Sequence, residues 1–518
     1  MPPFLFHRKR IDNIKINKPK KRNEQDAARI IFKTLVAIIR NCKMKKVLII
    51  IIVIALKSSF LLSQVTFEKT YGNELNEYHE YGVSVQQTSD NGYIITGYSQ
   101  HQVTLNRNAL MVKTDAYGNL IWKKHYDNSQ NTRGNCVQET TDGGFISVGY
   151  IENPFSDSSN VYVTKLDNMG DTLWTKIFSN DIKDRGMSIR QTIEGGYIIT
   201  GFTCDSMWYD CDVYLIKINS IGEMEWYKTI GGLERDQAYC IEQTSDNGFI
   251  IIGSTFSFGN GGRDIYLIKT NENGDTSFTK TYGGFNTDNA YSIKQTSDGG
   301  YILVGETISF DQGQNYYDVY LIKTDEVGDT LWTKRYGGEQ WEVGRSIDLT
   351  DDGGYIITGH TESYGGSTGN VLVMKTDCSG DTLWTQTFGG NGFDWGNSVQ
   401  QTSDGGFIIA GYSSSFGNNN IDMYLIKING QGTLDIHRNP TTDEFGVFPN
   451  PANNILHIKT CDNTKIEIIN LTGRVIYNTN VNCKTDLFSI DISGYSKGLY
   501  LVKLVSEKNS TIEKIIIK

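Results

Sequence analysis

The sequence predicts an all-β protein, built as a seven-bladed β-propeller followed by a small β-sandwich. Three observations lead to this prediction. The 518 residues include 54 glycines, 29 tyrosines and 22 phenylalanines but only 7 prolines, which is typical of tight turns between aromatic-rich strands. One phrase recurs seven times along the chain at an almost constant interval. Near the C-terminus this phrase is replaced by a different pattern, in which short alternating strands are separated by glycine turns.

The N-terminal segment is basic, and the rest of the chain is acidic. Residues 1–64 carry 15 Lys and Arg against 3 Asp and Glu, whereas residues 65–518 carry 34 against 56, a net charge of -22. The apolar run Val47–Leu56 follows a lysine pair, as in a secretory signal peptide, so we expect one over 44–64. An upstream extension, disordered or helical, is expected over 1–43, and an uncleaved anchor is the alternative. The acidic remainder argues against a nucleic-acid partner.

The recurring phrase is a glycine followed by an aromatic and an aliphatic run. Its copies lie 52 residues apart five times and 54 residues apart once. They begin at Gly92, Gly144, Gly196, Gly248, Gly300, Gly354 and Gly406. A second column is always lysine: Lys113, Lys165, Lys217, Lys269, Lys323, Lys375 and Lys427. Repeats of about 40 to 50 residues with four short β runs are typical of propeller blades.

One copy shows the four strands expected in each blade. Strand A is predicted over Tyr291–Thr296, strand B over Tyr301–Gly305, strand C over Asp318–Lys323 and strand D over Thr330–Lys334. Asp-Gly and Asn-Gly pairs provide the positive φ that hairpin turns require. Seven such copies predict a propeller over 65–434.

The ring is expected to close through its two ends. Val65–Gly72 matches strand D, whereas Met423–Ile428 matches strand C, so the first strand should complete the last blade and remove an open edge. Strand D also carries an aromatic column that we expect to fill the space between blades: Phe67, Trp122, Trp174, Trp226, Phe278, Trp332 and Trp384. The unit of strand C, glycine turn and Leu-Trp strand D resembles the tryptophan-docking repeats of quinoprotein-like propellers, and the whole period resembles the β-propeller repeat arrays of secreted bacterial proteins. That resemblance implies a fold and no particular activity.

After a linker over 435–444, residues 445–518 follow a new pattern. Alternating strands such as Ile455–Ile458 and Gly498–Leu504, separated by glycine turns, predict a small Ig-like antiparallel sandwich. This segment also resembles the type A C-terminal sorting domain of the type IX secretion system of Bacteroidota. The residues that carry the resemblance are Pro449, Asn450, Pro451, Gly473, Gly498 and Tyr500.

The sorting-domain resemblance implies a route and a location. It implies export by the signal peptide through the periplasm, contact with the type IX secretion machinery, and removal of the domain. The protein would then be secreted or attached to the cell surface, and it would meet a membrane only through export or attachment. The alternative is an ordinary adhesion sandwich, which predicts no cleavage.

Cysteine spacing suggests two disulfides in an exported chain. Cys204 and Cys211 lie in one loop between strands B and C, and Cys461 and Cys483 lie in the C-terminal segment.

Two polar columns fall where the loops before strand A and before strand C should share one face of the ring. The first holds Glu80, Asp184, Asp236, Asp288, Glu342 and Asp394, with Thr132 in the remaining copy. The second holds Asn108, Asn160, Asp212, Asp264, Asp318, Asn370 and Asp422. Two interpretations are open: binding of a cation such as Ca²⁺ or of a polyhydroxyl ligand, or capping of loop N–H groups.

The loops between strands B and C differ from copy to copy, so specificity is expected there. Their candidate ligand-binding residues are Trp208, Tyr209, Phe256, Phe258, Tyr316, Tyr317, Tyr364 and Phe416. Aromatic faces among amides and hydroxyls suit sugars or a protein surface, although the same side chains could serve to pack their own loops.

These observations favour a binding module for a glycan or protein ligand over an enzyme. The sequence contains no HExxH motif and no phosphate-binding loop, and its two Gly-x-Ser-x-Gly matches, at 365–369 and 494–498, fall among strand patterns without the following helix that a nucleophile elbow requires. We expect no cofactor, with Ca²⁺ as the one ion considered. The alternatives are a polysaccharide-active enzyme that uses carboxylates at the channel mouth, and a purely structural envelope protein.

Overall fold

The computed structural model describes most of the chain from residue 65 onward. The described residues are 65–72, 77–126, 131–153, 158–180, 183–310, 316–365, 368–416, 420–434, 446–448, 455–459, 464–470, 474–481, 488–505 and 510–517. The predicted signal peptide, upstream extension and linker lie outside them. Every element named in the described part is a strand, which confirms the all-β prediction. No helix there is long and apolar enough to span a membrane.

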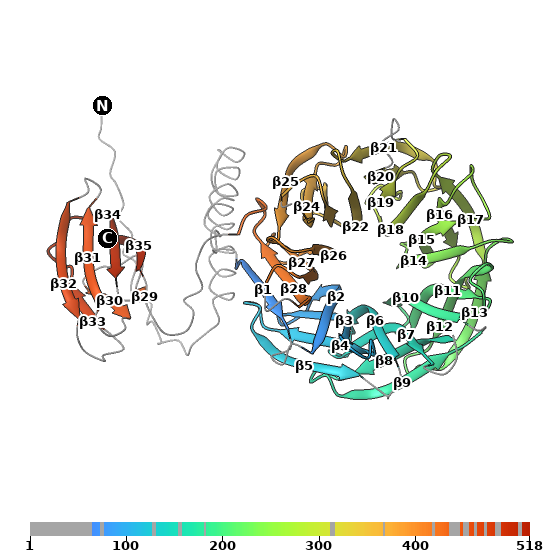
Figure 1. Cartoon of the computed structure of the whole chain (residues 1–518), viewed down its shortest axis with the longest axis horizontal. Helices are drawn as coiled ribbons and strands as arrows, with labels where there is room; N and C mark the ends of the chain where they lie inside the picture. Colours follow the sequence, from blue (N-terminus) through green and yellow to red (C-terminus); the bar gives the residue numbers. More distant parts are fainter. Residues whose placement is uncertain are drawn as a thin grey trace, which may run out of the picture. The chain divides into compact units, whose positions relative to one another are not determined.

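Seven four-stranded antiparallel blades form a ring around a central channel (Figure 1). Blades 1 to 3 contain β2 Tyr78–Gln87, β3 Tyr93–His101, β4 Arg107–Thr114, β5 Leu120–Tyr126, β6 Asn131–Glu139, β7 Phe145–Glu152, β8 Ser159–Leu166, β9 Thr172–Phe178, β10 Lys183–Gln191, β11 Tyr197–Cys204, β12 Cys211–Ile218 and β13 Met224–Ile230. Blades 4 and 5 contain β14 Asp236–Gln243, β15 Phe249–Thr255, β16 Asp264–Thr270, β17 Thr276–Tyr282, β18 Asp288–Gln295, β19 Tyr301–Thr307, β20 Asp318–Thr324 and β21 Thr330–Tyr336. Blade 6 contains β22 Glu342–Leu349, β23 Tyr355–Thr361, β24 Asn370–Thr376 and β25 Thr382–Phe388.

Blade 7 closes the ring as the sequence predicts. It combines β26 Asp394–Gln401, β27 Phe407–Ser413 and β28 Asp422–Ile428 with the first strand of the chain, β1 Phe67–Tyr71. Strand β1 pairs antiparallel with β28, from Phe67 opposite Lys427 to Tyr71 opposite Met423. Because the two ends of the ring share backbone hydrogen bonds, the ring has no open edge at its seam.

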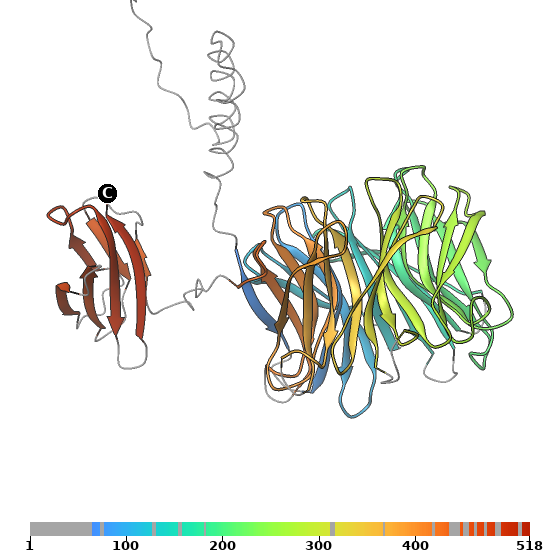
Figure 2. The same ribbon diagram turned by 90° about the horizontal axis from the view of Figure 1, so that it is seen from above.

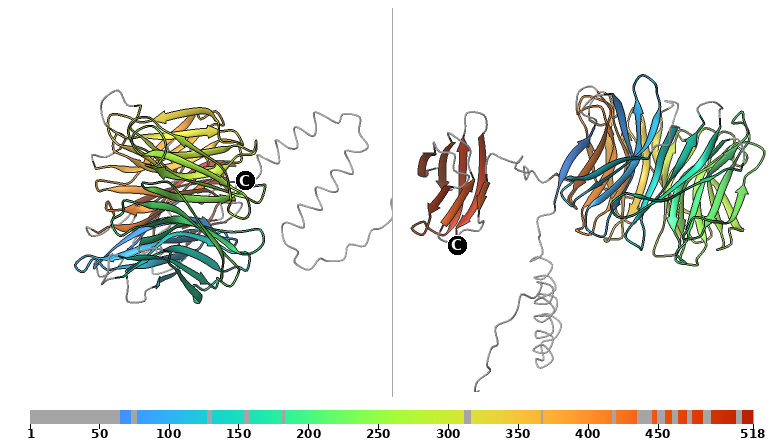
Figure 3. Two further views of the ribbon diagram at one scale, coloured as in Figure 1. Left: turned by 90° about the vertical axis from the view of Figure 1, so that its right-hand side faces the viewer. Right: turned by 90° about the horizontal axis from the view of Figure 1, so that it is seen from below.

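The strands run from one flat side of the ring to the other (Figures 2 and 3). One side, the hairpin face, carries the A–B and C–D turns; the other, the loop face, carries the B–C loops and the connections between blades. At the A–B turns, one position has positive φ in all seven blades, with Asn91 at 64° and Asn247 at 66° where the other five copies have glycine. Left-handed backbone of this kind favours glycine and, after it, asparagine.

The aromatic column of strand D packs between blades, as predicted. Each ring lies against the C–D turn glycine of the next blade, so closely that an ideal Cβ there would come within 2.6 to 2.9 Å of the ring. The pairs are Phe67 with Gly118, Trp122 with Gly170, Trp174 with Gly222, Trp226 with Gly274, Phe278 with Gly328, Trp332 with Gly380 and Trp384 with Gly432. A side chain at these glycines would therefore push two blades apart.

The lysine column binds the hairpin face together. Lys165 is 2% exposed, and its Nζ lies 2.9 Å from the Asp142 carboxylate in the A–B turn of its own blade. Five other lysines make the equivalent ion pair: Lys113 with Asp90, Lys269 with Asp246, Lys323 with Asp298, Lys375 with Asp352 and Lys427 with Asp404. In blade 3 the turn lacks that aspartate, and Lys217 pairs with Glu225 instead.

The C-terminal segment forms two antiparallel sheets. One holds β29 Gly446–Phe448, β30 Ile455–Lys459 and β33 Phe488–Asp491; the other holds β31 Thr464–Asn470, β32 Val475–Val481, β34 Gly498–Val505 and β35 Ser510–Ile517. Buried side chains of both sheets, such as Leu456 and Val502, form one core. The predicted sandwich is thereby confirmed.

Candidate functional site

The first acidic column caps backbone N–H groups on the loop face. In five of the seven copies the carboxylate accepts the N–H of the residue four positions earlier, at 2.7 to 2.9 Å. These five are Asp184, Asp236, Asp288, Glu342 and Asp394. Glu80 pairs with Lys123 instead, and the Thr132 hydroxyl accepts the N–H of Ala109 at 2.8 Å. The column thus caps a loop N–H group in five of the seven blades.

The second column meets the first between neighbouring blades. An ideal Cβ at Gly283 would lie 2.5 Å from Asp288 Oδ2, and Asp264 Oδ1 is also among its nearest atoms. Burial, reinforced by the charge of Asp288, raises the pKa of Asp264, and burial also raises the pKa of Asp288. No group of three or more His, Cys, Asp or Glu side chains suited to a metal occurs among the described residues. Calcium binding therefore stays a prediction.

The predicted aromatic residues are spread around the loop face rather than gathered. Phe258 packs on Tyr266 and Phe416 on Tyr424, with centroids 5.5 Å apart in both pairs. Phe256 lies under Arg263, Tyr317 contacts Trp341, and the Tyr364 hydroxyl donates to the Gly337 carbonyl at 3.1 Å. Tyr209 is 73% exposed, and Tyr316 lies just before β20 in blade 5. Tyr364 lines one hollow, with Arg335 and Glu342, and Trp208 lines another, with three arginines.

That hollow, here called the arginine hollow, opens on the loop face across blades 2 to 4 and has a volume of 620 Å³. It is lined by Arg133, Asn135, Tyr150, Arg185, Met187, Phe202, Trp208, Arg235, Gln237 and Tyr239. Three of these side chains are cations, none is acidic, and four are aromatic.

A β-bulge in strand A helps to build the hollow. In blade 3 the pairing of β10 with β11 shifts between Gly186 and Ser188, which leaves Met187 outside the regular ladder. The equivalent bulge residues of blades 2 and 4, Asn135 and Tyr239, line the hollow beside it. Bulges redirect side chains in this way, often next to functional sites.

The loop that carries Trp208 is tightly fixed. A disulfide joins Cys204 to Cys211 at the ends of the paired strands β11 and β12. Inside the loop, the Asp205 carboxylate accepts the N–H groups of Met207 and Tyr209. Trp208 itself has a positive φ of 63°, a conformation that a bulky residue adopts only when its surroundings impose it.

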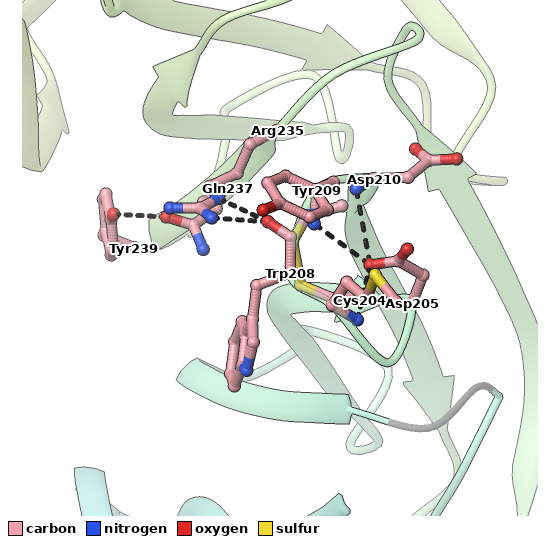
Figure 4. Close-up of a disulfide and its surroundings, with 10 residues drawn as sticks. Cys204, Asp205, Trp208, Tyr209, Asp210, Arg235, Gln237 and Tyr239 are labelled. Atoms are coloured by element: carbon pink, nitrogen blue, oxygen red, sulfur yellow. Dashed lines mark hydrogen bonds between the residues drawn. A yellow bond between two sulfur atoms is a disulfide. The ribbon is translucent and has the colours of Figure 1, made fainter.

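Cations surround the Trp208 side chain. Arg235 donates to the Trp208 carbonyl, with its Nε 3.0 Å away, while the indole points away from the disulfide (Figure 4). The ring has Lys183 Nζ at 4.6 Å and the Arg185 guanidinium at 4.7 Å from its centroid. Such cation–π contacts stabilise both partners, so the indole is held in place before any ligand arrives.

A second group of charges lines the central channel. A cavity of 260 Å³ is bordered by the first strands of all seven blades, and four successive blades contribute Arg190, Glu242, Lys294 and Asp348. Glu242 lies 3.0 Å from Arg190 and 2.6 Å from Lys294. Burial alone would raise the pKa of Glu242, but these two cations outweigh it and hold that pKa at about 2.

Sequence reasoning missed both the arginine hollow and this ring of channel-lining side chains, here called the channel belt. The belt has a simple signature, since its residues lie two positions after the Ser or Cys of strand A. The column reads Gln86, Gln138, Arg190, Glu242, Lys294, Asp348 and Gln400. In the glutamine copies the side-chain oxygen accepts a backbone N–H of the next blade at 2.6 to 2.7 Å. The hollow has no comparable column, because its residues differ in type from blade to blade.

Comparisons with known proteins identify the C-terminal segment. Residues 446–518 match the model of the secretion system C-terminal sorting domain. Of the predicted motif residues, Pro449, Asn450, Pro451 and Gly473 lie outside the described residues, as do Cys461 and Cys483. Gly498 begins β34, and the Tyr500 hydroxyl donates to the Ser496 carbonyl at 2.7 Å. A comparison with curated proteins found no match.

Solved structures with some likeness to the chain include propellers. The β-propeller domain of the trilobed protease from Pyrococcus furiosus is 10% identical, with a TM-score of 0.41 over 70% of this chain and 98% of that one. An α-L-arabinanase from Penicillium chrysogenum is 10% identical, with a TM-score of 0.38 over 72% and 99%. A protein of unknown function from Bacteroides caccae is 12% identical, with a TM-score of 0.34 over 60% and 94%.

Those TM-scores are too low to support any argument about activity, and the propeller architecture rests on the strand pairing described above. The family match is of a different kind, because it covers the whole sandwich and ends with the chain. It agrees with the sequence motifs and with the observed strands. Residues 446–518 are therefore a type IX secretion sorting domain, and the chain is exported to be secreted or attached to the cell surface.

Proposed function

We propose that the chain is an exported binding module whose propeller binds a glycan in the arginine hollow. The observation that carries this proposal is the lining of the hollow: three arginines, four aromatic side chains and two amides, with no carboxylate among them. This composition is unusual on a segment with a net charge of -22. It is the kind of concave site, with a few convergent polar groups, that holds small ligands.

Each class of side chain in the hollow has a use toward a sugar. Aromatic faces such as that of Trp208 pack against the C–H faces of sugar rings. The amides of Asn135 and Gln237 can both donate and accept hydrogen bonds, as hydroxyl groups do. The disulfide and the Asp205 contacts fix Trp208 in advance, so less ordering is needed on binding.

Two features favour a glycan over the other ligands and roles. A protein partner would need a large interface, commonly about 800 Å² on each side, whereas the lining described here is a single polar hollow. Hydrolysis of a polysaccharide would need two carboxylates facing the substrate. Asp236 and Asp288 instead accept hydrogen bonds from loop N–H groups.

The proposal is tested by removing the indole. Trp208→Ala should weaken binding to a polysaccharide panel, measured by affinity electrophoresis, by about tenfold or more, because stacking contacts on aromatic rings dominate such sites. The matched control is Phe310→Ala, which removes a loop aromatic of blade 5 that is 41% exposed; its binding should stay within about twofold.

Equal behaviour of the two variants would contradict the placement of the site. Reducing-sugar release should be followed in the same samples. If the chain releases sugar and Asp288→Asn abolishes that release, the chain is an enzyme and the binding-module proposal is wrong.

A further inference from the structure

We infer that the glycan held in the arginine hollow is an acidic polysaccharide, whose ring carboxylate or sulfate ester binds the guanidinium groups of blades 2 and 3. This inference rests on the proposed function and adds the chemical class of the ligand. The charges in and around the hollow support it.

Arg133 is the cation most available to a ligand. Its guanidinium carbon lies 4.3 Å from the ring centroid of Tyr98 and 5.7 Å from that of Tyr150. Among the described residues it forms no ion pair, and its Nε is buried without a hydrogen-bond partner. Two aromatic rings thus hold the group in place while its charge stays unneutralised by the described side chains.

Arg185 lies beside Arg133 and is only partly neutralised. Its guanidinium is 4.3 Å from the Tyr150 centroid, so this ring lies near both arginines. An Nη of Arg185 lies 3.3 Å from Glu152, but the same carboxylate also pairs with Arg107 at 3.4 Å. One carboxylate shared between two guanidinium groups leaves a net positive charge next to Arg133.

Arg235 completes the positive lining without contributing a free group. It donates to the Trp208 carbonyl, and its main chain bridges to Cys211 of blade 3. Its charge raises the local potential, while its hydrogen bonds are used to hold the loop. The hollow therefore offers one unpaired and one half-paired guanidinium beside a fixed indole.

An anionic oxygen group is the ligand chemistry that satisfies these donors. Guanidinium binds carboxylate, sulfate and phosphate oxygens through paired N–H donors, and such charge-assisted bonds are about twice as strong as neutral ones. A neutral sugar would leave the positive charge uncompensated.

The test compares acidic polysaccharides with their neutral counterparts, using the full chain. The probes are polygalacturonate, alginate and hyaluronate, each beside its carboxyl-reduced form, and chondroitin sulfate beside its desulfated form. Affinity is measured at two salt concentrations for the unaltered chain, for Arg133→Gln and for Arg335→Gln. Arg335 is a matched control, since it lies near an aromatic ring, Phe310, but outside the hollow.

At least one acidic form should bind about tenfold or more tightly than its neutral counterpart, and Arg133→Gln should remove most of that difference, as expected for one charge-assisted contact. Arg335→Gln should keep the affinity difference between the acidic and the neutral form. Loss through carboxyl reduction identifies a uronate, and loss through desulfation identifies a sulfate ester.

Two results would overturn the inference, and they differ in what else they reject. If neutral forms bind as tightly as acidic ones and Trp208→Ala abolishes both, the hollow binds neutral glycans and the proposed function stands. If no polysaccharide in either form binds, both the inference and the proposed function are wrong. Circular dichroism and thermal unfolding of Arg133→Gln show whether the variant is folded, so a loss of binding can be assigned to the charge.

Discussion

The two flat faces of the propeller differ in how far their side-chain contacts recur from blade to blade. On the hairpin face the same contacts recur from blade to blade: a left-handed turn residue, a buried lysine paired with a turn aspartate in six blades, and an aromatic ring against the next turn glycine. On the loop face only the backbone caps recur, and the side chains around them differ. Repetition therefore marks what the fold needs, and departure from it marks where a ligand can be selected.

This difference between the faces predicts two kinds of mutant. Changes in repeated columns should lower stability and leave binding intact, whereas changes in the arginine hollow should lower binding and leave stability intact.

Removal of an aromatic from between blades should be the most damaging change. Trp332→Ala leaves a cavity against Gly380 and Tyr355, and such truncations cost about 3 to 5 kcal/mol. Guanidinium chloride unfolding measures the loss. The neighbouring Leu331→Ala is the control, because that side chain is 57% exposed and should change stability by less than about 0.5 kcal/mol. Similar losses in the two variants would show that the column does not carry the blade packing.

The channel belt should come second. Glu242→Ala removes the carboxylate that lies between Arg190 and Lys294, and a partly buried charge left without its partner costs about 2 to 3 kcal/mol. Urea unfolding measures the loss. The control is Gln138→Ala in the same column, which removes one hydrogen bond to a backbone N–H and should cost about 1 kcal/mol. A smaller loss for Glu242→Ala than for its control would show that the ion pairs of the channel belt do not stabilise the fold.

The same carboxylate should make stability depend on acid. The pKa of Glu242 is about 2 in the folded chain, below its ordinary value of 4.5. A lowered carboxyl pKa means that its stabilisation is complete above pH 4.5 and is lost as the pH falls toward 2. The turn aspartates Asp142, Asp246 and Asp298, whose pKa values are also about 2, act in the same direction.

Unfolding midpoints measured between pH 6 and pH 2.5 test this dependence. They should fall less steeply for Glu242→Gln than for the unaltered chain, because the variant has no carboxylate to protonate at that place. Parallel curves would mean that Glu242 does not contribute to the acid sensitivity.

The smallest effect is expected at a single lysine of the hairpin face. Lys165→Met keeps the buried stem and removes the ion pair to Asp142, whose side chain is 60% exposed, so the loss should be about 1 kcal/mol or less. Thermal unfolding measures it, beside Lys228→Met, which removes an exposed pair to Asp275 and should have no measurable effect. Glycan binding should be unchanged in both variants, and a loss of binding would break the distinction between the two faces.

Much of the fold follows from spacing in the sequence. The 52-residue interval, the Asp-Gly turns and the unpaired strand at each end predict seven blades and their closure, and β1 pairs with β28 as expected. The two cysteines at the ends of the Trp208 loop are seven positions apart and belong to adjacent strands, so their contact is local. The sorting domain was recognisable because its motifs are contiguous in the chain.

The candidate site was only partly predictable. Trp208 was among the expected ligand-binding aromatics, but nothing in the sequence joined it to Arg133, whose column holds Tyr81, Arg185, Gln237, Asn289, Val343 and Trp395 in the other copies. The acidic columns stand out in the sequence because they repeat, and in five copies of the first column the carboxylate accepts a loop N–H group. The repeat pattern thus predicts the scaffold of the propeller better than it predicts the residues of the arginine hollow.

The sequence by itself determined the blade number, the closure of the ring, the turn chemistry and the export address, because each depends on residues near one another in the chain or at a fixed period. Only the tertiary structure decided which side chains share a cavity. Arg133 and Arg185 come from the first strands of two blades and Trp208 from a B–C loop, and they meet because the blades pack radially and a bulge in each first strand shifts which residues face the loop-side opening. Side-chain direction at such a bulge depends on the register with the neighbouring strand, which a repeat pattern does not record.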